Sequence, residues 1–176
     1  MTISIRRFYE TIVWKILMRN NGQEVSTTHL ENLWEKLRET LKKQGYEVDG
    51  MNMPHVRALV LEPAEYARIG RIVDRLPKTT SNTIEEYGRD YSTESAIGTV
   101  VQPPGSENEY VIFLSKSRCE SDILAAGGTV VSSESYYLCH ELIHVWEHLL
   151  NLKPAGSLAK ELFSDKNFVG HILVQK

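Results

Sequence analysis

Apolar residues recur at helical spacing most clearly in the segment that begins near residue 27. Four leucines and one tryptophan share a face of the predicted helix: Leu30, Leu33, Trp34, Leu37 and Leu41. Thr27 or Thr28 offers a hydroxyl that can cap this helix, and Gly45 follows it as the usual residue beyond a helix C-terminus. The segment therefore predicts an amphipathic helix that packs on a core.

A weaker apolar pattern, interrupted by charges, covers residues 3–20. Its apolar members are Ile5, Phe8, Ile12, Trp14, Ile16 and Leu17. The pattern predicts another amphipathic helix, ended by Asn20-Asn21-Gly22. Two interpretations stay open: the helix packs against the body of the protein, or it binds a partner or inhibits the protein's own site.

Short apolar runs predict strands at residues 56–61, 97–101 and 110–114. The second and third are separated by a Pro-Pro-Gly-Ser turn at residues 103–106, which predicts an antiparallel hairpin. The strands are embedded among helices, so the chain as a whole predicts an α+β fold with a small mixed sheet.

Helices are predicted on both sides of the hairpin. Pro63 opens one that runs to about Leu76. Residues 78–94 are polar and aperiodic, which favours an extended loop, with a mobile lid as the alternative. Ser132 or Ser133 caps a later helix that runs to about residue 152, and a last helix covers residues 157 to about 170.

Composition narrows the class of protein. The chain has 176 residues, 41% hydrophobic and 24% charged, as expected for one globular domain with or without an appendage. A net charge of −3 gives no support for a nucleic-acid or anionic-membrane partner. Charges interrupt the N-terminal apolar residues, so neither a signal peptide nor a membrane span fits. Two cysteines are too few for a disulfide scaffold, and a cytoplasmic location is expected.

The residues most able to bind a metal ion lie in the predicted helix that begins near Ser132, where they form the motif His-Glu-x-x-His. His140 and His144 are four residues apart and share a helix face, where two imidazoles can hold one tetrahedral zinc ion. Glu141 lies about 100° round the helix, where it can act on water at the metal without ligating the metal. The motif predicts a Zn²⁺ site that needs a third ligand.

Two candidates for the third ligand are rejected. His148 continues the spacing, but on one straight helix it lies roughly 6 Å further along the axis, too far to share the metal. The metzincin pattern needs a Gly three residues after the second His and another His three residues later. Glu147 and Leu150 occupy those positions.

The remaining candidate lies on the last helix, where Glu161 and Asp165 are four residues apart and share a face. Two antiparallel helices can bring Glu161 opposite His144, which completes a His₂Glu set and leaves the fourth position to water. Asp165 can then accept the second ring N–H of a ligand histidine. The alternative is an ordinary solvated acidic face.

With these residues the chain resembles the gluzincin branch of zinc metallopeptidases, and especially the compact minigluzincins. Their signature is His-Glu-x-x-His followed by a Glu-x-x-x-Asp helix, often written Asn-Glu-x-x-Ser-Asp. In this chain Glu161, Ser164 and Asp165 match the second motif, and Lys160 replaces the usual Asn. The resemblance covers about residues 95–170. It implies these roles: His140, His144 and Glu161 as zinc ligands, Glu141 as general base and acid, and Asp165 as the carboxylate that orients His140.

The resemblance also implies a zincin-like fold with an active-site helix and a glutamate helix. Residues 95–176 would form this metallopeptidase core. Residues 1–94 would form an N-terminal helical region of unknown role, within the same domain or beside it. The strand at residues 110–114 would be the active-site edge that pairs with an extended substrate.

Other side chains near the motif have two interpretations each. Tyr136, Tyr137 and His171 are candidates for stabilising an oxyanion, with structural packing as the alternative. Cys139 is either a reactive thiol or a small packed residue, and Cys119 is either packed or an inhibitory zinc ligand.

The expected function is hydrolysis of a polypeptide substrate by a zinc metalloendopeptidase. One alternative is a metal-stabilised binding or regulatory module with little catalysis. Another is a latent peptidase, held off by its own N-terminal helix or by the tail at residues 169–176. A repressor-cleaving peptidase of the ImmA/IrrE type is a related alternative. Glu141 favours catalysis, because a purely structural zinc site has no use for it and usually has four protein ligands.

Overall fold

The described part of the chain includes most of the predicted elements. The computed structural model describes Thr11, Trp14, Lys15, Met18 and Arg19, together with residues 21–75, 98–101, 108–119, 122–124, 128, 130–152 and 157–172. The predicted loop at residues 78–94, the turn at 103–106, most of the N-terminal helix and the end of the tail lie outside these residues. No helix within them is long and apolar enough to cross a membrane.

Four of the described strands form one mixed sheet. Its order is β1 (Gly22–Glu24), β2 (His55–Leu61), β4 (Glu109–Ser115) and β3 (Gly98–Val101). Strand β2 runs parallel to β4, whereas β1 and β3 run antiparallel to their neighbours. The predicted hairpin is confirmed, since Val100 of β3 faces its partner in β4. The first strand, β1, was not predicted.

Strand β4 lies inside the sheet. It pairs with β2 on one side and with β3 on the other, and residues 110–115 are all buried. The prediction that residues 110–114 form a substrate-pairing edge is therefore wrong, because no edge of this strand is left over. The run of apolar residues suits a strand covered on both faces.

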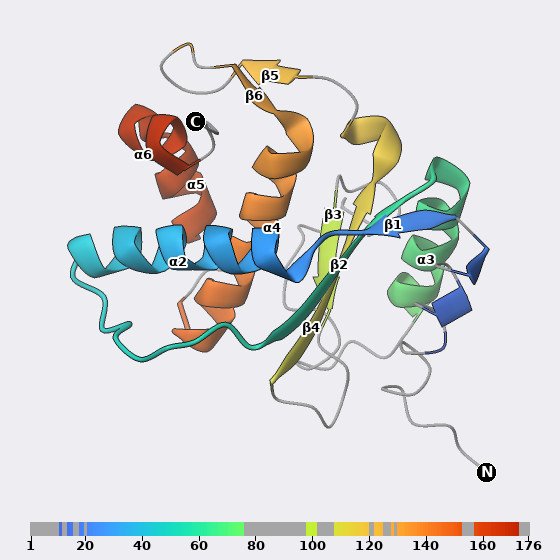
Figure 1. Cartoon of the computed structure of the whole chain (residues 1–176), viewed down its shortest axis with the longest axis horizontal. Coiled ribbons are helices and arrows are strands. Elements are labelled where there is room, and N and C mark those ends of the chain that lie inside the picture. The colour runs from blue at the N-terminus through green and yellow to red at the C-terminus, as the bar shows by residue number, and fades with distance from the viewer. Residues whose placement is uncertain are drawn as a thin grey trace.

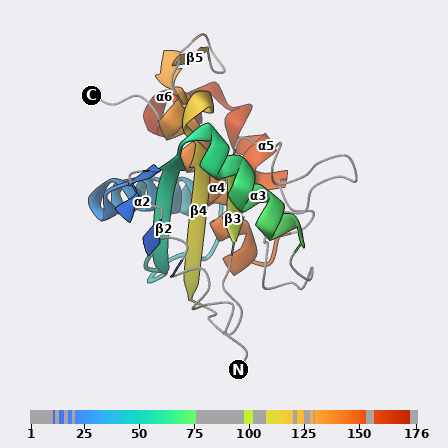
Figure 2. The ribbon, with the colours of Figure 1, turned by 90° about the vertical axis from the view of Figure 1, so that its right-hand side faces the viewer.

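Helices cover both faces of the sheet (Figures 1 and 2). Helix α3 (Pro63–Arg75) lies on one face. The other face carries α2 (Thr27–Lys43) and α4 (Ser133–Leu149). Helices α5 (Ser157–Phe163) and α6 (Lys166–Ile172) pack on these two helices. The predicted α+β class with a small mixed sheet is confirmed in this form.

Smaller elements join these layers. A 3₁₀ turn, η1 (Lys116–Arg118), follows β4 directly. Strands β5 (Asp122–Leu124) and β6 (Val130–Ser132) then form a separate antiparallel ribbon that leads into α4. Neither β5 nor β6 was predicted.

Helix α2 matches its prediction except at its cap. Its leucine and tryptophan stripe is fully buried, and Gly45 adopts a φ of +96°, a conformation that favours glycine. The hydroxyl of Ser26, rather than of Thr27 or Thr28, accepts the hydrogen bond from the backbone N–H of His29. The first predicted cap was therefore wrong by one residue or two.

The last predicted helix is two helices. The side-chain oxygen Oδ1 of Asp165 accepts the N–H of Asn167 at 2.9 Å, so this aspartate caps α6. The hydroxyl of Ser164 donates to the carbonyl of Lys160 at 2.7 Å, which closes the end of α5. These side-chain hydrogen bonds end α5 and begin α6 at a place where one continuous helix was predicted.

The two halves of the sequence share one core. Strand β2, from the first half, pairs along its whole length with β4 from the second. The indole of Trp34 in α2 stacks on that of Trp146 in α4, with ring centroids 4.0 Å apart. By contrast, Trp14 and Met18 of the N-terminal segment lie in helical backbone with side chains 61% and 65% exposed, and they add little to this core.

Replacing Trp34 with alanine should destabilise the protein by about 3–5 kcal/mol, because it removes a fully buried aromatic side chain and leaves a cavity beside α4. Urea unfolding followed by circular dichroism measures this difference. Trp14→Ala is the matched control and should change stability by less than about 0.5 kcal/mol. Equal effects of the two substitutions would contradict the described core.

Candidate metal centre

Helix α4 supplies the candidate site. The hydroxyl of Ser132 caps it by accepting the N–H of Ser135 at 3.2 Å. Most of the helix is enclosed by the sheet and by α2 and α5, so even the polar residues Glu141 and His144 are only 3% and 7% exposed. The side chain of His140 is 37% exposed and gives the site its open side.

His140, Glu141 and His144 lie together as the motif predicts. Each residue offers one potential ligand atom, and these three atoms all lie within 4.8 Å of one another. Among the described residues, this is the one group of such side chains that could hold a metal ion. The two imidazole rings are nearly perpendicular, at 85°, with centroids 4.5 Å apart. Ligand atoms this close together are compatible with a single bound ion.

A carboxylate that sequence reasoning missed contacts this group. Oε1 of Glu147 lies 2.6 Å from Nδ1 of His144, and both side chains are buried. Oε2 of Glu147 accepts the backbone N–H of Leu158 at 3.1 Å. The sequence could have indicated this contact, because His144 and Glu147 are three residues apart and therefore lie on one helix face.

Helix α5 lies against the histidines through an aromatic ring. Phe163 stacks on His140 at 5.7 Å between centroids, and Tyr136 packs on Phe163 at 4.4 Å. Tyr137 contacts Tyr136 edge-on at 5.4 Å. Burial raises the pKa of Tyr136, which keeps its hydroxyl protonated. These two tyrosines therefore lie beside the group, within an aromatic cluster.

The structure does not bring Glu161 and Asp165 into the metal-binding group. Both side chains are exposed. Phe163, which faces His140, lies two residues after Glu161, so these two side chains point in directions about 200° apart round α5. The carboxylate of Asp165 caps α6. The backbone of His171 lies in α6, but its side chain is outside what the structure describes.

His148 also lies outside the group, in agreement with its rejection as a third ligand. The hydroxyl of Tyr110 in β4 lies 2.8 Å from Nδ1 of His148. Burial lowers the pKa of His148 and raises the pKa of Tyr110 to about 12. A neutral imidazole beside a protonated phenol can form this hydrogen bond, which ties the end of α4 to the sheet.

Strand β3 passes directly beside Glu141. A Cβ atom added to Gly98 would lie 3.1 Å from Oε1 of Glu141 and 2.5 Å from Cδ2 of Leu114. Only glycine leaves room here for the carboxylate and the leucine together. Sequence reasoning placed Gly98 in a strand but gave no sign of this contact.

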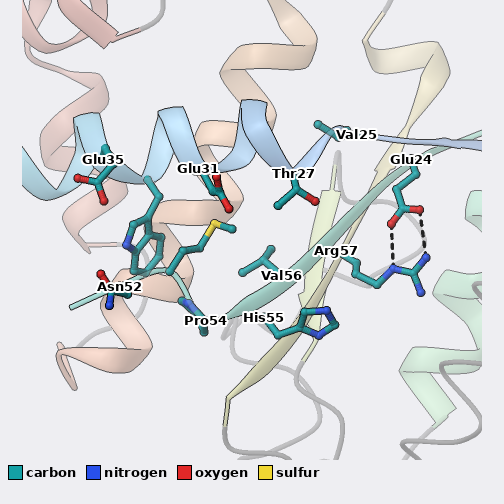
Figure 3. Close-up of a pocket in the computed structure, with 12 residues that line it drawn as sticks. Glu24, Val25, Thr27, Glu31, Glu35, Asn52, Pro54, His55, Val56 and Arg57 are labelled. Carbon is teal, nitrogen blue, oxygen red and sulfur yellow. Dashed lines mark hydrogen bonds and ion pairs between the residues drawn. The ribbon is translucent and has the colours of Figure 1, made fainter. Parts of the chain in front are cut away.

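A hollow lies between α2 and β2, away from the motif (Figure 3). It encloses about 650 Å³ and has carboxylates from Glu31 and Glu35 on the α2 side. On the strand side, Arg57 makes a bidentate ion pair with Glu24 at 2.9 and 3.0 Å. None of the three metal-binding side chains lines this hollow, so it is separate from the candidate metal centre.

Comparison with protein families, with curated proteins and with solved structures finds no match to this chain. What the chain does must therefore be inferred from its own residues.

Cys139 should resist thiol reagents in the folded protein, whereas Cys119 should react. Cys139 is fully buried and burial raises the pKa of its thiol, so little thiolate forms. Cys119 is half-buried. Titration with a chromogenic disulfide should detect one thiol in the native protein and two in urea. In Cys119→Ser, fast modification without denaturant would show instead that Cys139 is accessible.

Proposed function

We propose that this protein is a zinc-dependent metallopeptidase in which Glu141 is the general base and acid. The observation that carries the proposal is the group of His140, Glu141 and His144 on one buried helix, with ligand atoms within 4.8 Å of one another. A structural site has no need for a carboxylate in this position, whereas a hydrolase needs a base beside the metal.

The side chains fit zinc in type as well as in position. Neutral imidazole is a preferred zinc ligand, and the contact of His144 with Glu147 occupies one ring nitrogen and leaves Nε2 for the metal. When bound, the zinc ion would acidify a water molecule and polarise the carbonyl group of the peptide bond.

Glu141 has the position required for proton transfer. Its carboxylate lies at the metal-binding group and is almost excluded from solvent. There it can take a proton from the attacking water and later give it to the leaving amine. Tyr136 and Tyr137 remain our candidates for the oxyanion donor, because they precede His140 by one helical turn.

The third ligand is proposed from the sequence alone. Glu161 would complete a His₂Glu set, but only with α5 rotated relative to the described arrangement, in which Phe163 faces His140. Glu161→Ala should then weaken zinc binding strongly. An unchanged zinc affinity would remove Glu161 from the set and leave the third position to another group.

A metal-stabilised regulatory module is the second candidate function. It requires the same histidines and so shares the zinc-binding prediction. It differs in the part played by Glu141, which such a module does not use. A latent peptidase, including one of the repressor-cleaving type, would differ from an active one in regulation rather than in these residues.

Glu141→Gln should abolish peptide hydrolysis while leaving zinc bound. Loss of a general base typically costs about 10²–10⁴-fold in rate, and the amide that replaces the carboxylate cannot take the proton. Zinc content by mass spectrometry and cleavage of casein or a peptide library measure the two properties. His140→Ala together with His144→Ala should remove the metal and serves as the metal-free reference.

The active-enzyme proposal fails if the wild type and Glu141→Gln bind zinc equally and neither cleaves any peptide, even after truncation of the tail. That result would favour the regulatory module. Loss of zinc in Glu141→Gln would instead identify Glu141 as a ligand.

Gly98→Ala should lower kcat/KM by about 10–100-fold, because the added methyl group would press on Oε1 of Glu141 and displace the base. Zinc content should stay at the wild-type level. Thr99→Ala is the matched control, since its side chain points to the opposite face of β3. It should retain hydrolysis, and equal losses in the two variants would indicate a general effect on the strand.

A further inference from the structure

We propose that Glu147 is the positioning residue of the metal centre: it sets the ring of His144 so that Nε2 faces the metal, and it fixes α5 to the same ring. The inference rests on the metal site of the proposed function, but not on peptide hydrolysis. The resemblance to gluzincins implied that the carboxylate of Asp165 orients His140. The inference gives the corresponding role, orientation of His144, to Glu147.

The hydrogen bonds of Glu147 define the state of the imidazole. Oε2 accepts the N–H of Leu158, and Oε1 lies 2.6 Å from Nδ1 of His144. An ionised Glu147 can only accept hydrogen bonds, so its contact with Nδ1 requires the proton to be on Nδ1. The lone pair of a neutral ring is then on Nε2, the nitrogen that would bind a metal ion.

Burial makes this contact specific. Glu147 is 3% exposed and His144 is 7% exposed, so water can replace neither partner easily. A buried carboxylate needs hydrogen bonds to both oxygens, and the two described contacts supply one to each. Rotation of the ring would break the first contact.

The second contact connects the ring to α5. Leu158 lies in the first turn of this helix, where backbone N–H groups have no acceptor within the helix. Glu147 supplies an acceptor for one of them. At the other end of α5, Phe163 stacks on His140. This short helix is thus linked to both histidines, to His140 through Phe163 and to His144 through Glu147.

Glu147→Gln tests the proposal in the full-length protein. The amide has one acceptor oxygen, so it cannot accept from both Leu158 N–H and His144 Nδ1–H. We expect zinc and cobalt affinity, measured by competition with a chelator, to fall by about 10–100-fold. The visible spectrum of the cobalt form should also change. Glu134→Gln, the same substitution on the same helix without an imidazole contact, should keep wild-type affinity and spectrum.

A measurement on the wild type does not depend on any variant folding. In metal-free protein at a pH well above the usual histidine pKa of about 6.5, ¹⁵N NMR should show His144 protonated on Nδ1. A ring protonated on Nε2 would overturn the proposal, and so would equal metal affinity and spectra in Glu147→Gln and Glu134→Gln. Zinc binding without hydrolysis would end the peptidase proposal but leave this test intact.

Discussion

The burial of helix α4 is the constraint on which the rest of the structure depends. The sheet, α2 and α5 enclose this helix, although it carries the two histidines of the motif and the buried glutamates Glu141 and Glu147. Polar groups in such a place are costly unless they find partners inside. His144 and Glu147 satisfy each other at 2.6 Å, and Leu158 satisfies the second oxygen of the glutamate. The candidate chemistry is thus held in place by the same contacts that make the burial tolerable.

Neighbouring elements support α4 from three directions. Trp34 of α2 stacks on Trp146, so the first half of the sequence contributes directly to the position of the motif. Gly98 lets the edge strand β3 approach Glu141 closely. Phe163 of α5 covers one face of His140 but leaves the side chain partly exposed. A partly open histidine beside an enclosed carboxylate is the arrangement that a substrate could reach from one side.

In the region after α4, a hydrogen bond between near neighbours in the sequence changes which residues share a helix face. An uninterrupted helix from Ser157 would keep Glu161 and Asp165 on one face. Instead, Asp165 uses its carboxylate to cap α6, and the chain turns after Phe163. Asp165 therefore no longer continues the face of Glu161, and within α5 itself it is the ring of Phe163 that faces His140. Capping depends on hydrogen bonds between neighbours in the sequence and can outweigh a longer helical pattern.

Periodicity and motif spacing by themselves determined the helices at α2, α3 and α4, the β3–β4 hairpin, and the meeting of His140, Glu141 and His144, because all of these depend on neighbours within one helix or hairpin. Tertiary structure decided the rest. Pairing of β2 with β4 made β4 an inner strand, and the packing of α5 brought the backbone N–H of Leu158 to the second oxygen of Glu147. Such choices depend on residues far apart in the chain, where hydrogen-bond pairing and burial, rather than local pattern, set the outcome.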